Sequence, residues 1–197
     1  MEWSPEVRVL VAPARTFREL AASPPTARLW VARPLVLLLL LGTTVSLQAS
    51  GRMSARLVLD GMIAFAFVPI FMVVGMAIVY RRRPRRVNFG HALDVYFIAN
   101  APWLAWAMLF DVWRSFLTPA ESSTMLTLPY YLLLVSFAAV AVWSTYVDLQ
   151  FFRVFLSRED GRPGRDLLLA RAVCWVGIIG YFVGHEFWEY FALWINV

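Results

Sequence analysis

The sequence has few of the groups that stabilise a secreted domain or carry enzymatic chemistry. Among 197 residues it has no lysine, one cysteine and two histidines, and charged residues make up 16%, against about a quarter in soluble domains. The lone Cys174 excludes a disulfide within the chain, and its apolar surroundings in the sequence predict a packing role. The serine nucleophile elbow, the Walker A loop and the dinucleotide-binding glycine motif are all absent. We therefore predict that the chain is not an enzyme and binds no cofactor.

Apolar residues, in contrast, make up 60% of the chain. A soluble fold would have to expose the excess, whereas lipid would cover it. A transmembrane helix needs about 20 mostly apolar residues, and five segments meet this requirement: 29–48, 57–80, 93–113, 129–149 and 167–194. We predict an all-α, polytopic membrane bundle of five transmembrane helices formed by residues 29–197, preceded by a short N-terminal segment, 1–28.

The 18 arginines alternate between the predicted loops. Five occur up to Arg33 at the start of the first span, five lie in the second loop, and five occur from Arg153 to Arg171 at the start of the last span, but the first and third loops have two and one. Because cytoplasmic loops are enriched in basic residues, we expect the N-terminus inside and the C-terminus outside. The second-loop cluster is expected to fix topology and attract anionic lipid headgroups rather than nucleic acid; it consists of Arg81, Arg82, Arg83, Arg85 and Arg86. Basic charge from arginine alone, with abundant alanine, indicates a high-GC bacterial genome, so we expect the bacterial cytoplasmic (inner) membrane.

The N-terminal segment is amphipathic rather than spanning. Pro13 suits a first helical turn, and Phe17, Leu20 and Ala21 fall on one helical face. This pattern predicts a short helix lying in the inner membrane interface, with a solvated tail as the alternative.

Two prolines lie near the middle of predicted spans. Pro69 falls in the second span and Pro102 in the third. Each removes a backbone N–H donor, so each is expected to interrupt its helix. Such breaks serve packing or create a cavity, and packing is the favoured interpretation.

Ionisable residues inside a span are functional candidates because lipid disfavours them. At the outer side, Asp60 lies four residues from Arg56, and Asp111 lies three residues from Arg114. Both pairs are predicted either to anchor the interface or to contribute to a proton or cation site. At the inner side, Arg171 is predicted to pair with Asp148 or Asp94 and so hold helices together.

The last span ends in an unusual polar group. His185 and Glu189 share a helical face, with Glu186 close by, and two nearby carboxylates in a low-dielectric setting suit proton handling or cation binding. A wet interfacial helix is the alternative. His185-Glu186 resembles the start of an H-E-x-x-H zinc motif, but position 189 is Glu and His91 is predicted at the other membrane face, so no metal site is expected. A pigment or quinone site at either histidine stays open.

The residues from Ala12 to Leu20 contain P-x-x-T-F-x-x-L, which precedes the first span. Together with the region around Pro102, the end of the fourth span (143–155) and the arginine-containing loop before the last span, this segment resembles the bacterial branch of the Yip1-domain family. The resemblance covers nearly the whole chain and implies five spans with a cytoplasmic N-terminus. Eukaryotic relatives are implicated in membrane traffic and in binding small prenylated GTPases. No catalytic residues carry over.

Two functions follow from these features. The lack of catalytic groups, beside many small and aromatic residues in the spans, predicts a non-catalytic scaffold or accessory subunit that packs against another membrane protein or self-associates. The alternative is a component of a small-solute or cation permease that uses the outer acidic residues Asp60, Asp111, Glu186 and Glu189.

Overall fold

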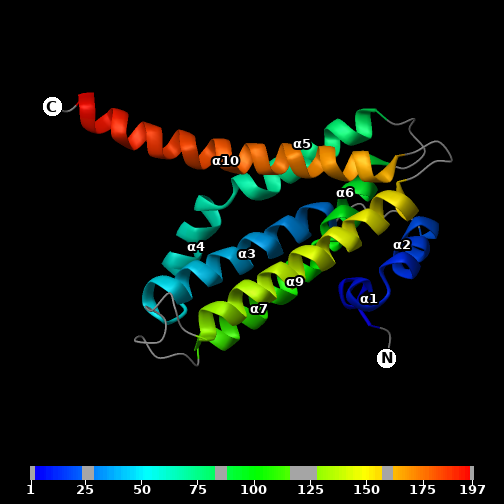
Figure 1. The fold of residues 1–197 in the computed structure, drawn as a ribbon, viewed down its shortest axis with the longest axis horizontal. Helices are drawn as coiled ribbons and strands as arrows, with labels where there is room; N and C mark the ends of the chain where they lie inside the picture. Colours follow the sequence, from blue (N-terminus) through cyan, green and yellow to red (C-terminus); the bar gives the residue numbers. More distant parts are fainter. Residues whose placement is uncertain (1–2, 24–28, 83–87, 116–127, 157–161, 196–197) are drawn as a thin grey trace.

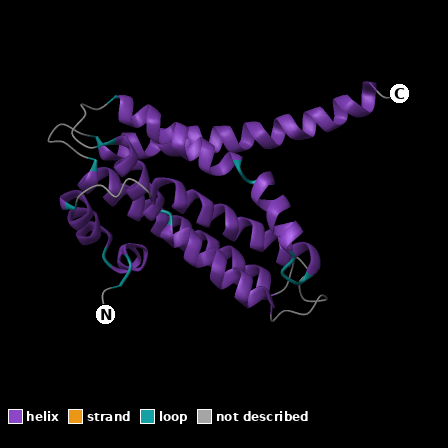
Figure 2. Ribbon diagram, turned by 180° about the vertical axis from the view of Figure 1, so that it is seen from behind, coloured by secondary structure: helices purple, strands orange, loops and turns teal. Residues whose placement is uncertain are grey.

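The computed structural model describes residues 3–23, 29–82, 88–115, 128–156 and 162–195, and within them it leaves out the side chains of 29–30, 48, 114–115, 128–130 and 185–195. Over this part of the chain the secondary structure is entirely helical (Figures 1 and 2). The helices are α1 (Pro5–Val11), α2 (Pro13–Ala22), α3 (Leu29–Ser50), α4 (Ala55–Ala64), α5 (Phe67–Arg81), α6 (Phe89–Ile98), α7 (Ala101–Ser115), α9 (Leu128–Gln150), the π-helical turn η1 (Phe151–Phe155) and α10 (Pro163–Ile195).

Four helical segments are long and apolar enough to cross a membrane. They are Ala55–Arg81, Phe89–Trp113, Tyr131–Phe155 and Pro163–Gly184, and they coincide with the second to fifth spans expected from the sequence. The first expected span corresponds to α3, whose apolar part over described side chains, Val31–Leu47, is shorter than the other four. The part of the chain that the structure describes is therefore all-helical and has four segments of spanning length, which indicates an integral membrane protein.

The two mid-span prolines, Pro69 and Pro102, each follow a break in their helix, whereas Pro34 lies inside the continuous helix α3. The second span divides into α4 and α5 at Phe65 and Ala66, and the third divides into α6 and α7 at Ala99 and Asn100. Since Pro69 has no N–H for the carbonyl of Phe65, that carbonyl accepts instead from the backbone N–H of Val68 at 3.0 Å. The breaks allow each half of a span to take a different neighbour.

Glycines set the closest helix contacts. A Cβ on Gly42 of α3 would lie 2.3 Å from the carbonyl oxygen of Val58 in α4, and a Cβ on Gly75 of α5 would lie 2.8 Å from that of Ala170 in α10. Small residues let membrane helices approach this closely. As a result, α4 packs along α3, α5 packs along α10, and the break before Pro69 turns α4 away from α10 (Figures 1 and 2).

The turn between α3 and α4 depends on Ser46 and Gly51. Gly51 has a φ of 65°, which glycine adopts readily. The buried Ser46 hydroxyl donates to the carbonyl of Arg52 at 2.9 Å and accepts from the N–H of Ser54 at 2.8 Å. These bonds satisfy backbone groups that leave the helix.

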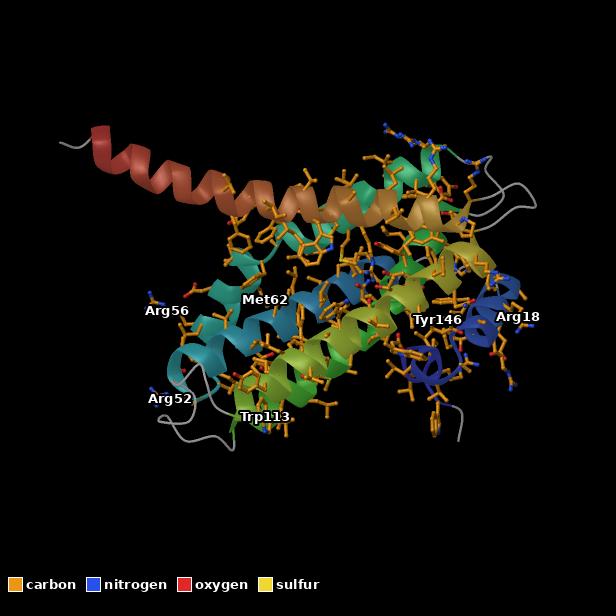
Figure 3. All side chains as sticks on the ribbon, viewed as in Figure 1. Arg18, Arg52, Arg56, Met62, Trp113 and Tyr146 are labelled. Carbon is orange, nitrogen blue, oxygen red and sulfur yellow. The ribbon has the colours of Figure 1, made fainter. Side chains whose placement is uncertain are left out.

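The best-packed region lies at one end of the bundle, where α2, α6, η1 and the start of α10 meet. The rings of Phe151 and Phe152 are fully buried and contact Tyr96 of α6. Arg18 lies at this end, whereas Arg52 and Arg56 lie at the opposite end (Figure 3). We call the end that contains Arg18 the arginine-rich end.

Candidate functional site

An ion pair joins α9 and α10 near the arginine-rich end. Arg171 donates from Nε and Nη2 to Oδ2 of Asp148 at 3.0 and 2.7 Å, and the Asp148 side chain is 9% exposed. The same guanidinium donates to the hydroxyls of Thr145 at 2.6 Å and Ser144 at 3.1 Å. Arg171 therefore donates to three side chains of α9 and holds α9 and α10 together. This arrangement serves to stabilise the bundle.

The sequence also offered Asp94 as a partner for Arg171, but Asp94 pairs with Arg33 of α3. Arg33 donates from Nη1 to Oδ1 of Asp94 and from Nε to Oε1 of Glu6 at 3.1 Å. The side chain of Asp94 is 4% exposed and that of Glu6 is 39% exposed. This cluster of one arginine and two carboxylates ties α1, α3 and α6 together.

The carboxyl of Glu6 is ionised at neutral pH. Partial burial raises its pKa, but a backbone hydrogen bond and the charge of Arg33 outweigh that effect and hold the pKa below its usual value.

The N-terminal helices pack onto the bundle. Phe17 of α2 is fully buried and meets Phe151 edge to face, with ring centroids 5.7 Å apart, and His91 Nε2 contacts the carbonyl oxygen of Leu20 at 3.2 Å. We expected the apolar face of α2 to enter lipid. Phe17 on that face is instead covered by protein, because η1 supplies aromatic rings at that point. Ala21 is exposed.

The outer acidic residues do not form one cluster over the described residues. Asp60 lies on an exposed face of α4, 3.9 Å from Arg56, whereas Asp111 of α7 is buried and accepts from the hydroxyl of Thr44 at 2.7 Å. His185, Glu186 and Glu189 lie in α10, but their side chains lie outside the described residues, as does that of Arg114. The same holds for Arg83, Arg85 and Arg86, whereas Arg81 and Arg82 are exposed at the end of α5.

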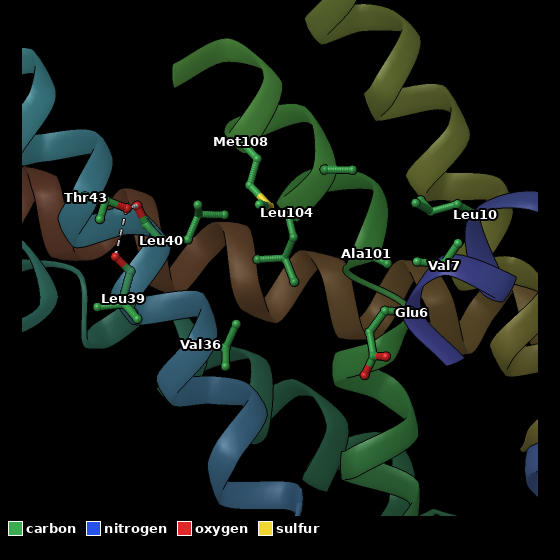
Figure 4. Close-up of a pocket in the computed structure, with 11 residues that line it drawn as sticks. Glu6, Val7, Leu10, Val36, Leu39, Leu40, Thr43, Ala101, Leu104 and Met108 are labelled. Carbon is green, nitrogen blue, oxygen red and sulfur yellow. Dashed lines mark hydrogen bonds between the residues drawn. The ribbon is translucent and has the colours of Figure 1, made fainter. Parts of the chain in front are cut away.

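An apolar groove of about 400 Å³ lies between α1, α3 and α7 (Figure 4). Its walls include Val36 and Leu40 of α3 and Leu104 and Met108 of α7, and the side chain of Glu6 in α1 borders it. Neither Asp60 nor Asp111 lines it, and the described residues contain no group of three or more potential metal ligands. The geometry suits an apolar occupant.

One face of α10 repeats a small residue every seven positions, at Ala170, Gly177 and Gly184. Ala170 packs under Gly75 and is 1% exposed, and a Cβ on Gly177 would lie 2.4 Å from the ring of Phe71. Around Gly184, and around Gly180 one turn earlier, no described atom lies within 4 Å of a Cβ position. We call residues 180–195 the distal half of α10; its backbone continues beyond the start of α5 (Figure 1).

These features define a class: a protein whose described part is all-helical, with spanning apolar helices, ion pairs that link helices, and an apolar groove. Comparison with protein-family models, with curated proteins and with solved structures yields no match. The resemblance to the Yip1-domain family therefore stays a prediction.

Sequence reasoning missed the groove and the pairing of Arg33. A signal for the pairing was present, because Arg33 and Asp94 both lie where predicted spans begin or end at the inner side. The groove has no sequence signal of its own, since aliphatic residues on α3 and α7 read as ordinary lipid-facing positions.

Proposed function

We propose that this chain is a non-catalytic scaffold or accessory subunit of the bacterial cytoplasmic membrane, which packs the distal half of α10 against a helix of another membrane protein. The observation that carries this proposal is the open space around Gly184. Its heptad counterparts Ala170 and Gly177 are closely covered by α5, so the same packing face continues where the described chain supplies no neighbour.

Close approach is the physical basis of such a contact. Lipid covers apolar side chains as well as protein does, so membrane helices associate through close packing at small residues and through hydrogen bonds. Gly180 and Gly184 form the small-xxx-small spacing that favours this packing. A partner helix with small residues at the contact would fit here.

The proposed topology has five spans, with α3 as the first, and the N-terminus in the cytoplasm. The arginine distribution supports it, as does the position of Arg18 at the end of the bundle opposite Arg52 and Arg56 (Figure 3). Five spans also agree with the resemblance to the bacterial branch of the Yip1-domain family. In a Cys174→Ser background, Gly90→Cys should resist a membrane-impermeant thiol reagent in intact cells and react after lysis; reaction in intact cells would reverse the topology.

The partner contact is tested by cross-linking in native membranes followed by purification in mild detergent. Gly184→Leu should remove the cross-linked partner, because the larger side chain prevents close approach. Gly164→Leu is the matched control, since Gly164 lies in the same helix and also has no described atom within 4 Å of a Cβ position. Unchanged cross-linking by Gly184→Leu would contradict the proposal, and a product of only two copies of this chain would reassign the surface to self-association.

A further inference from the structure

The groove between α1, α3 and α7 is lined almost wholly by apolar surface and has one carboxylate, that of Glu6, at its rim. Val36 and Leu40 form one wall and Leu104 and Met108 form the other, and the side chain of Glu6, a residue of α1, borders the groove with its carboxylate at the rim (Figure 4). Its volume of about 400 Å³ falls within the range of small-molecule sites, roughly 300–1,000 Å³.

The dimensions of the walls favour an extended chain. On α3 the lining runs from Val36 to Thr43, and on α7 from Ala101 to Met108; seven residues of helix rise about 10 Å. The one hydroxyl in this stretch, that of Thr43, donates to the carbonyls of Leu39 and Leu40 at 3.0 and 2.7 Å. The groove beyond Glu6 therefore presents hydrocarbon, and an acyl chain of a lipid is the matching ligand.

Helix α1 places the mouth of the groove at the membrane interface. Val7 and Val11, four residues apart on one side of this short helix, are 41% and 70% exposed, and Trp3, which precedes the helix, is 57% exposed. Tryptophan favours the headgroup level of a bilayer. Glu6, beside Val7, then lies at the depth of lipid headgroups.

The charge at the mouth selects the headgroup. Glu6 is ionised, 39% exposed and accepts from Arg33, which also serves the buried Asp94. One guanidinium is thus shared between two carboxylates, so Arg33 compensates the charge of Glu6 only in part. An anionic headgroup would be repelled here, whereas a primary ammonium can donate a charge-assisted hydrogen bond to a carboxylate.

We propose that this groove binds one acyl chain of an aminophospholipid of the ethanolamine type, whose ammonium is held by Glu6. The site is separate from the distal half of α10, so it does not rest on the partner contact proposed above; it requires only that α3 and α7 face lipid.

The experiment is native mass spectrometry of the delipidated full-length chain in detergent, with phosphatidylethanolamine, phosphatidylcholine and phosphatidylglycerol of identical acyl chains offered in equal amounts. The ethanolamine lipid should be retained about fivefold over each of the others, the ratio expected for one partly exposed charge-assisted hydrogen bond. The quaternary amine of phosphatidylcholine carries positive charge but no hydrogen to donate, so it separates hydrogen bonding from charge.

Three variants assign the effect to the groove. Glu6→Gln should leave lipid bound but equalise the ethanolamine and choline lipids, whereas Glu19→Gln should change nothing, because Glu19 pairs with Arg8 and Arg15 on α2 and does not line the groove. Leu40→Trp should abolish retention of all three lipids by filling the groove. Thermal unfolding of each variant checks that the chain stays folded, and Ala105→Leu is a smaller second obstruction.

The pH dependence of lipid retention provides an independent test. Because the pKa of Glu6 lies below its usual value of 4.5, the carboxylate persists through neutral pH, and the ethanolamine preference should disappear only as pH falls below that value. Preferential retention of phosphatidylglycerol, equal retention of all three lipids, or retention unaffected by both Leu40→Trp and Ala105→Leu would each overturn the proposal, the last two by showing non-specific lipid at the protein surface.

Discussion

The two halves of α10 have the same apolar character but different surroundings. In the first half, Ala170 lies under Gly75 and Arg171 pairs with the buried Asp148 of α9. In the distal half, Gly180 and Gly184 have no described atom within 4 Å of a Cβ position. The difference lies in the neighbour, because α5 begins at Phe67 and the chain before it turns away to pack on α3.

This comparison shows how a proline can create a binding surface on another helix. Because of the break before Pro69, α4 packs against α3. An unbroken second span would have continued along α10, so the distal half of α10 lacks that neighbour (Figure 1). The heptad spacing of small residues nevertheless continues through Gly184. The small-residue face of α10 around Gly184 therefore remains available for close packing with a partner helix.

The largest effect is expected from breaking the ion pair in the first half. Arg171→Met leaves Asp148 buried without its cation, and removal of one partner of a buried pair lowers the free energy of unfolding by about 3–5 kcal/mol; because the Arg171 side chain is 25% exposed, we expect the lower end of that range. Unfolding of the purified chain in detergent, followed by circular dichroism, measures the loss.

The rescue variant for this pair is Arg171→Met with Asp148→Asn. Removing the unpaired charge should restore part of the lost stability. If the double variant is as unstable as Arg171→Met alone, the loss comes from packing of the arginine stem and not from the charge of Asp148.

The next effect compares one glycine of the packed pair with one of the distal half. Gly75→Val forces a methyl-bearing carbon toward the Ala170 carbonyl oxygen, 2.8 Å away, and overpacking of this kind lowers the free energy of unfolding by about 1–3 kcal/mol. Gly180→Val meets no described atom and should change stability by less than about 0.5 kcal/mol. Equal losses in the two variants, measured in the same unfolding assay, would remove the distinction between the two halves of α10.

Much of the helical layout could be predicted from the sequence because it depends on local properties. Apolar run length located the helices, and the missing N–H groups of Pro69 and Pro102 located the two breaks. The tertiary details could not be predicted in this way. Whether Phe17 is covered by lipid or by Phe151, for example, depends on η1, which lies more than 130 residues further along the chain.

For the same reason, the candidate sites could be predicted only in part from the sequence. The seven-residue spacing of Ala170, Gly177 and Gly184 is visible in the sequence, but which of them is covered depends on where α5 begins. Likewise, the sequence placed Asp94 and Asp148 near Arg171 as alternatives, and the choice depended on the position of Arg33 across the bundle.

The smallest effect locates the boundary between the two halves. Tyr181 stacks on Phe67 at the start of α5, with ring centroids 3.9 Å apart and planes at 19°, and such ring pairs contribute about 0.5–1.5 kcal/mol beyond burial. Tyr181→Leu keeps an apolar side chain but loses the stack, so it should lower the free energy of unfolding by about 1 kcal/mol. Val183→Ala is the control, because Val183 is 61% exposed and should change stability little. If the two substitutions have equal effects, the contact with α5 ends before Tyr181, and the surface open to a partner begins nearer to Gly177.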